Sequence, residues 1–220
     1  NIQARFAQGA SDNGIVDSYS KLGEYKGSPY IFESNYPVRI VDTYGEQFES
    51  QYFNIDAYMD EFVLSKKPDM ADEDYIWLRK EEVDYVVVAD FSDKDNIKER
   101  YFKYIDIQEG SKPLGICEVL YNNPDLGIQV YHKTDITFAR ARPATNGLSA
   151  DVPAKFRQDD EYYVYSREDG LKRIKKDKDF HKLFGSDKKK VKKLMKEAKM
   201  SYKEPKHLEE IFNLFPNINL

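Results

Sequence analysis

Apolar and polar side chains alternate along much of this chain. The clearest run extends from Ile128 to Phe138, where Val130, His132 and Ile136 share one parity and most residues between them are polar. A period of two is typical of β-strands that bury one face and expose the other. Such strands belong to antiparallel sheets, so the pattern predicts an antiparallel sheet with a solvated face rather than an α/β fold.

Turn signals divide the alternating region into hairpins. Residues 43–46 (Thr-Tyr-Gly-Glu) and 122–125 (Asn-Asn-Pro-Asp) separate alternating runs, and Asp169-Gly170 follows another such run. Asn, Pro and Asp-Gly pairs favour tight turns. Residues 142–160 instead have the composition of a long loop. We therefore expect a curved or part-closed antiparallel β-meander of about ten strands with one long loop.

The period becomes helical near the C-terminus. Val191, Leu194 and Met195 follow the spacing of an amphipathic helix, with lysines on its other face. This helix is predicted to be capped by Ser186 or Asp187, an earlier one by Asp177, and Pro205 suits the first turn of a third.

Three segments follow from these patterns, and the fold class is α+β, mainly β. We expect residues 1–29 to form a loosely ordered N-terminal segment, 30–176 an antiparallel β domain, and 177–220 a lysine-rich helical subdomain packed on it. The aromatic content of 14% agrees with extensive β structure. The longest apolar run, Tyr85 to Ala89, is far shorter than the roughly 20 residues of a membrane span, so no transmembrane segment is expected.

Charge is unevenly distributed. The net charge of -5 combines residues 1–166, with 18 Lys+Arg and 30 Asp+Glu (net -12), and residues 167–220, with 16 and 9 (net +7). Solvated helix faces account for the basic end more simply than a nucleic-acid site does, and no nucleic-acid partner is expected. Docking of the basic helices on another polyanion stays open as a weaker alternative.

Cysteine and histidine offer little catalytic chemistry. Cys117 is the single cysteine, so it forms no intrachain disulfide; its parity with Val119 and Tyr121 predicts a buried, inert side chain. His132 shares the parity of apolar neighbours, which favours a packed, hydrogen-bonded histidine over a general base. A Cys117–His132 dyad has no supporting motif.

Other site motifs are missing. The chain contains no Gly-rich phosphate loop, no Gly-x-Ser-x-Gly elbow and no His-Glu-x-x-His sequence. The acidic clusters at 69–74, 93–95 and 159–161 lack the spacing of a helix-loop-helix calcium site. We therefore predict no catalytic residue, no metal site and no cofactor. A carboxylate pair of the glycosidase kind cannot be chosen from sequence.

Aromatic side chains are the leading binding candidates. Exposed rings on neighbouring strands stack on sugars or contact a partner protein, although rings in a core produce the same pattern. The candidate binding residues are Tyr75, Trp77, Tyr101, Tyr104, Tyr131 and Tyr163.

Several segments together resemble a family of uncharacterised exported proteins of Gram-negative bacteria. These segments are residues 27–32, 118–121 and 160–165, and the lysine-rich helices from Phe180 to Val191; the resemblance covers most of residues 27–215. It implies a removed signal peptide and a periplasmic or outer-envelope location, with which the first residue, Asn1, agrees. The family has no assigned catalytic residues.

Two function hypotheses lead from this point. The first is a non-enzymatic envelope protein that binds a protein or glycan through an aromatic-rich sheet face. The alternative is an envelope hydrolase that uses carboxylates or His132.

Overall fold

The computed structural model is mainly β, with 52% strand, 19% helix and three helices near the C-terminus, which confirms the predicted fold class. The strands form a large twelve-stranded sheet. The chain divides into two compact units: unit 1 is Asn1–Glu99 with Thr134–Asp159, and unit 2 is Arg100–Lys133 with Asp160–Leu220. The structure describes residues 7–8, 19, 24–65, 76–90, 98–144, 151–216 and 218.

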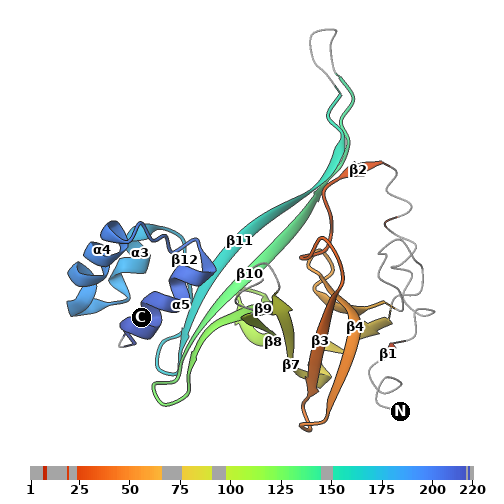
Figure 1. Ribbon diagram of the computed structural model, residues 1–220. Helices are drawn as coiled ribbons and strands as arrows, with labels where there is room; N and C mark the ends of the chain where they lie inside the picture. Colours follow the sequence, from red (N-terminus) through yellow and green to blue (C-terminus); the bar gives the residue numbers. More distant parts are fainter. Residues whose placement is uncertain are drawn as a thin grey trace. The chain divides into compact units, whose positions relative to one another are not determined.

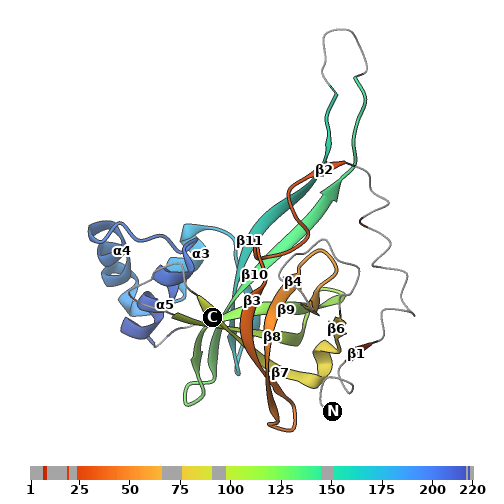
Figure 2. The same ribbon diagram turned by 45° about the vertical axis from the view of Figure 1, so that its right-hand side comes forward.

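Unit 1 is built on antiparallel hairpins in the order β1-β6-β5-β4-β3-β7. The β3–β4 hairpin turns at residues 43–46, as predicted (Figure 2). The strands are β1 (Ala7–Gln8), β3 (Tyr36–Asp42), β4 (Gln47–Asp56), β5 (Glu61–Leu64), β6 (Ile76–Leu78) and β7 (Val83–Asp90); a 3-10 turn, η1 (Lys80–Glu82), precedes β7. Strand β2 (Tyr25–Lys26) pairs in parallel with the start of β11 (Ala154–Ser166), whereas the other registered pairs of described strands are antiparallel.

The core of unit 1 is aliphatic and aromatic. Phe53, Phe62, Ile40 and Ile55 are completely buried, and the rings of Phe53 and Phe62 lie 5.9 Å apart. Asn54 is buried among them. Its side chain accepts a hydrogen bond from the Phe32 N–H and donates one to the Phe32 carbonyl, so it bonds both backbone groups of a residue that lies outside the strands.

Unit 2 contains five strands in the order β8-β9-β10-β11-β12 and the three helices near the C-terminus. Figure 1 shows the helices grouped together beside β12. The further bounds are β8 (Lys98–Glu109), β9 (Lys112–Asn123), β10 (Ile128–Ala139), β12 (Gly170–Ile174), α3 (Asp177–Lys182), η2 (Gly185–Asp187), α4 (Lys188–Glu197) and α5 (Pro205–Leu214). Strands β8, β10 and β11 begin in one unit and end in the other.

Both faces of the unit 2 sheet carry buried apolar side chains, whereas the alternation predicted a single buried face. One face packs on the helices: Val130, Tyr162 and Val164 share a core with α3, α4 and α5. On the other face, Cys117, Tyr131 and Tyr163 belong to a second apolar cluster. Two consecutive residues on one strand are therefore both buried, because their side chains point to opposite faces of the sheet and each face has its own apolar cluster.

A bulge in β9 breaks the predicted parity of Cys117, Val119 and Tyr121. Val130 pairs with Tyr121, but the next residue, Tyr131, pairs with Val119, which leaves Leu120 as the extra residue. Val119 therefore stays with Cys117, whereas Tyr121 moves to the helical face and stacks near Phe212 at 5.6 Å.

Two boundaries also differ from expectation. Strand β11 begins at Ala154, so the long loop predicted for residues 142–160 ends earlier. Helix α3 has Lys176 at its N-cap, and Asp177 is its first helical residue. Asp187 takes the cap position of α4 as predicted, but its side chain pairs with Lys190 instead of bonding the backbone. The Asp169-Gly170 hairpin and the start of α5 at Pro205 are confirmed.

Candidate functional site

The structure does not bring the described candidate aromatics into one exposed row. Trp77 is buried in unit 1, where it packs with Val63. Tyr131 and Tyr163 are buried in unit 2. Tyr101 is 40% exposed and Tyr104 is half-buried. The three buried side chains are thus removed from any contact face, and Tyr75 lies outside the described residues.

Unit 2 instead contains a chain of charged groups centred on His132. The imidazole Nδ1 lies 3.2 Å from Glu118 Oε2, and Nε2 lies 3.0 Å from Asp160 Oδ1. Arg100 donates to the same Glu118 carboxylate through Nε at 2.7 Å and Nη2 at 2.8 Å. This bidentate geometry is the strongest hydrogen-bonding arrangement of an arginine with a carboxylate. Two cations therefore hold the buried Glu118.

The geometry fixes the protonation of His132. Each ring nitrogen faces a carboxylate oxygen, and only the imidazolium donates from both nitrogens. Burial alone lowers the pKa of His132, but the hydrogen bonds with Asp160 and Glu118 outweigh it and raise this pKa to about 9. Burial raises the pKa of Glu118, but the bonds from Arg100 and His132 reverse this and lower it to about 2.

A charged His132 has no free lone pair, so in this arrangement it does not act as a general base. It also has no nitrogen available to activate Cys117, which is itself buried. Both the dyad and the His132 base therefore lack their chemical requirement. The prediction of a packed, hydrogen-bonded histidine agrees with these contacts.

Tyr162 connects this network to the helical segment. Its ring stacks on His132 with centroids 5.0 Å apart and an interplanar angle of 14°. An aromatic face adjacent to a cation is stabilising. The Tyr162 hydroxyl donates to the Lys203 carbonyl, and the Tyr202 ring lies 6.4 Å from that of Tyr162. The segment between α4 and α5 is thus tied to β11.

An open groove of about 670 Å³ lies beside these residues. Asp160, whose side chain is 45% exposed, belongs both to the groove wall and to the His132 network. Glu161 accepts hydrogen bonds from Arg173 and from Tyr163. The groove is lined by Asp160, Glu161, Tyr162, Arg173, Ile174, Lys175, Tyr202 and Lys203.

Sequence reasoning named only part of this site. Asp160 and Glu161 stood out as part of an acidic cluster, but Tyr162, Tyr202 and Lys203 were not among the six candidate binding residues. The hydrogen-bonded partners of His132 are 14 and 28 residues away along the chain. A lysine-rich helix followed by a Tyr-Lys pair is the available clue to the groove.

A second titratable cluster lies in unit 1. The Tyr19 hydroxyl donates to Asp56 Oδ2 at 2.5 Å, and the Met59 N–H donates to Oδ1. Burial raises the pKa of Asp56 to about 6 against these hydrogen bonds. The rings of Tyr58 and Phe156 pack near Tyr19. Asp56 is fully buried on β4, so its hydrogen bond with Tyr19 holds that side chain against the strand.

Among the described residues, no three His, Cys, Asp or Glu side chains are placed to hold a metal ion. The helices in this part of the chain include none with the length and apolar character needed to cross a bilayer.

No family model matches the chain, and no curated protein or solved structure matches it. The resemblance to exported proteins therefore stays a prediction.

Proposed function

We propose that the protein is a non-enzymatic envelope protein that binds a glycan in the groove of unit 2. The supporting observation is a wall of hydrogen-bonding groups held in place by internal partners: His132 fixes Asp160, and Arg173 fixes Glu161. Such preorganised polar groups bind a polar ligand without losing side-chain freedom. The support for an envelope location is the resemblance to the family of exported proteins.

Groove chemistry favours a glycan over a peptide or an apolar ligand. Five of the eight lining residues are charged, whereas pockets for apolar ligands are mainly hydrophobic. Sugar hydroxyls both donate and accept, which suits adjacent carboxylate and ammonium groups. Strand β12 is the last strand in the order, and Lys172 and Arg173 are exposed on it. Charged side chains on an edge strand oppose the addition of a peptide strand.

The hydrolase alternative has less support. One of its two candidate catalysts, His132, is held as an imidazolium between two carboxylates. The other candidate is a carboxylate pair, and the two groove carboxylates already have partners: Asp160 lies against His132, and Glu161 accepts from Arg173 and Tyr163. The groove supplies binding groups but no histidine lone pair for proton abstraction.

A glycan array, probed with the labelled protein, tests the proposal. We expect binding to at least one glycan class, weakened several-fold by Lys203→Ala and by Lys175→Ala. The matched controls are Lys206→Ala and Lys172→Ala, which remove exposed lysines nearby that do not line the groove. Absence of binding to every glycan, or equal losses in the controls, contradicts the proposal.

A further inference from the structure

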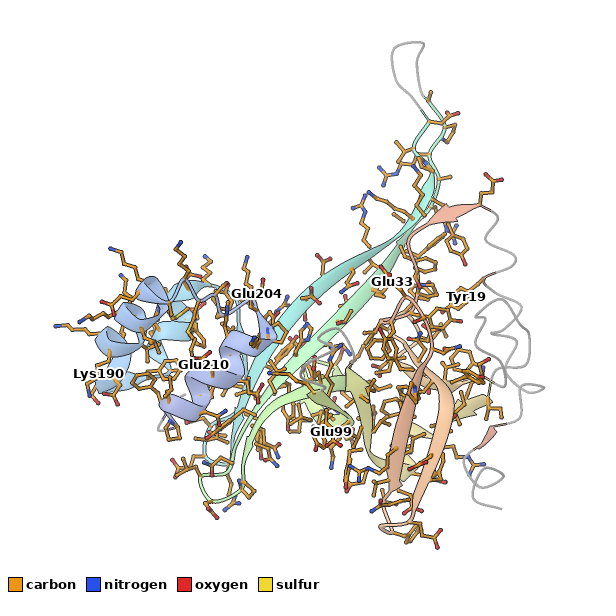
Figure 3. The ribbon with its side chains drawn as sticks, viewed as in Figure 1. Tyr19, Glu33, Glu99, Lys190, Glu204 and Glu210 are labelled. Atoms are coloured by element: carbon orange, nitrogen blue, oxygen red, sulfur yellow. The ribbon has the colours of Figure 1, made fainter. Side chains whose placement is uncertain are left out.

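Helix α4 presents a dense basic surface. Val191 and Met195 anchor it in the helical core of unit 2, and its lysines are exposed on the remaining faces. Figure 3 shows side chains with terminal nitrogens projecting outward from the helices around Lys190. We name this surface the α4 lysine face; it consists of Lys188, Lys189, Lys190, Lys192, Lys193 and Lys196.

The arrangement of these lysines opposes helix stability. The structure describes every residue in the first turn of α4. None of them is acidic, and three lysines lie at this N-terminal end of the helix. Cations at the positive end of a helix dipole are unfavourable, as are like charges four residues apart, such as Lys188 with Lys192. Among the described residues, two exposed ion pairs reach this face, Asp187–Lys190 and Lys193–Glu197. A conflict of this kind between local sequence and helix stability is typical of functional or strained sites.

The chain leads directly from this face to the groove. Lys199, in the left-handed conformation at φ 53°, reverses the chain after α4. The next residues include Tyr202 and Lys203 of the groove wall. Lys175 and Lys203 are exposed, and within the described part of the chain neither forms an ion pair with a carboxylate. Along the chain, exposed lysines therefore extend from α4 to the groove wall, where Lys175 and Lys203 lie beside Asp160 and Glu161.

We propose that the groove's ligand is an anionic polysaccharide whose chain continues along the α4 lysine face. This inference rests on the proposed function and names the class of glycan. Ten helical residues extend about 15 Å, a length that accommodates several sugar units of an extended chain. Anionic groups along such a chain pair with successive lysines and release their counterions, as in other polyanion complexes.

Two other polyanions fit less well. A membrane surface calls for apolar residues that insert beside the basic ones, but the apolar side of α4 is buried in the core. Glu209 and Glu210 are exposed on α5, and their negative charges limit how far the basic surface extends over that helix. Single-stranded nucleic acid is held by stacking on aromatic rings and arginine, and the sequence of α4 contains neither.

Titration with dextran sulfate and with uncharged dextran of equal length tests the inference. We expect wild-type protein to bind dextran sulfate at least tenfold more tightly at about 50 mM salt, with affinity falling steeply as salt rises. The variant K188E/K189E/K192E should lose roughly tenfold or more in affinity for dextran sulfate and show a shallower salt dependence. The control K98E/K112E/K172E carries the same charge change at exposed lysines away from α4 and should lose much less.

The outcomes separate the inference from the proposed function. Equal loss in the two triple variants, or no measurable binding of dextran sulfate, overturns the anionic assignment. Phosphatidylserine vesicles or duplex DNA bound as tightly as dextran sulfate, with the same dependence on α4, also overturn it. If array glycans bind in a manner that depends on Lys203 but not on α4, the proposed function survives and this inference fails. If no glycan binds, both fail.

Discussion

His132 joins two carboxylates of unit 2 through its two ring nitrogens. Glu118 is buried and also held by Arg100, whereas Asp160 is half-exposed at the groove. Removing one partner from such a cluster leaves a buried charge with fewer compensating bonds. The stability of unit 2 and the position of a groove residue thus depend on the same imidazolium.

His132→Gln should therefore destabilise the protein. We expect a loss of about 2–4 kcal/mol in the free energy of unfolding, because Glu118 keeps Arg100 but loses its second cation. Urea titration measures this change. His181→Gln, on α3, is the control and should change stability by less than about 1 kcal/mol. Similar losses of unfolding free energy in the two variants would show that the hydrogen bonds of His132 contribute no more to stability than the contacts of His181.

Stability should also depend on pH through the same residues. The folded pKa of His132, about 9, lies above its ordinary 6.5, so its contribution is complete below pH 6.5 and is lost as pH rises through 9. The pKa of Glu118, about 2, lies below 4.5, so its contribution is present above pH 4.5 and is lost as pH falls through 2. Melting temperatures should fall between pH 6.5 and 9.5 in wild type and much less in His132→Gln. A parallel fall in both proteins contradicts this assignment.

The sequence predicted the environment of His132 but not its partners. Its parity with Val130 predicted a packed side chain, and the His132 side chain is indeed buried. Arg100, Glu118 and Asp160 come from three other strand segments, and no local pattern relates them. Tyr131 and Tyr163 looked like surface candidates because a sheet with one solvated face was assumed; the second core of unit 2 buries them.

At the scale of elements, periodicity and turn residues predicted most hairpins and all three described helices. Three hairpin turns of unit 2 contain a glycine in the left-handed conformation: Gly110 at φ 68°, Gly127 at φ 65° and Gly170 at φ 76°. What the pattern missed were the bulge at Leu120 and the start of β11 at Ala154. Both depend on pairing with a distant strand, because composition alone does not fix where a ladder begins or skips.

Gly127 and Gly170 should respond differently to alanine. A Cβ at Gly170 meets nothing within 4 Å, so Gly170→Ala should cost about 1 kcal/mol of unfolding free energy from backbone strain. A Cβ at Gly127 would lie 3.1 Å from Arg167 Cβ, so Gly127→Ala should cost about 2 kcal/mol. Chemical denaturation of both variants checks the order. A larger loss for Gly170→Ala would contradict the crowding described at Gly127.

Helix α4 should show opposite changes in stability and binding. Acidic residues in the first turn complement the helix dipole, so K188E/K189E should raise the free energy of unfolding by about 0.3–1 kcal/mol per substitution at low salt. The same change should weaken dextran sulfate binding. Lys98→Glu, outside any helix, should do neither. Thermal denaturation and titration of the same samples make the comparison, and loss of stability in K188E/K189E would contradict it.

For the whole molecule, the sequence separated an acidic β-rich part from a basic helical end, and the structure assigns that end to a unit with its own strands and two cores. The groove and the α4 lysine face both belong to this unit. We therefore assign ligand binding to unit 2 and a structural role in unit 1 to the aromatic cluster around Tyr19 (Figure 3).

Amide chemical-shift mapping of the full chain with a dextran sulfate oligosaccharide tests this account most directly. We predict shifts at residues 160–162, 173–175, 188–196 and 202–203, because these ranges contain the groove wall and the α4 lysine face. We also predict that the shifts saturate with ligand and weaken with added salt. Shifts centred on β3 and β4 of unit 1, or none at all, would contradict the proposed site.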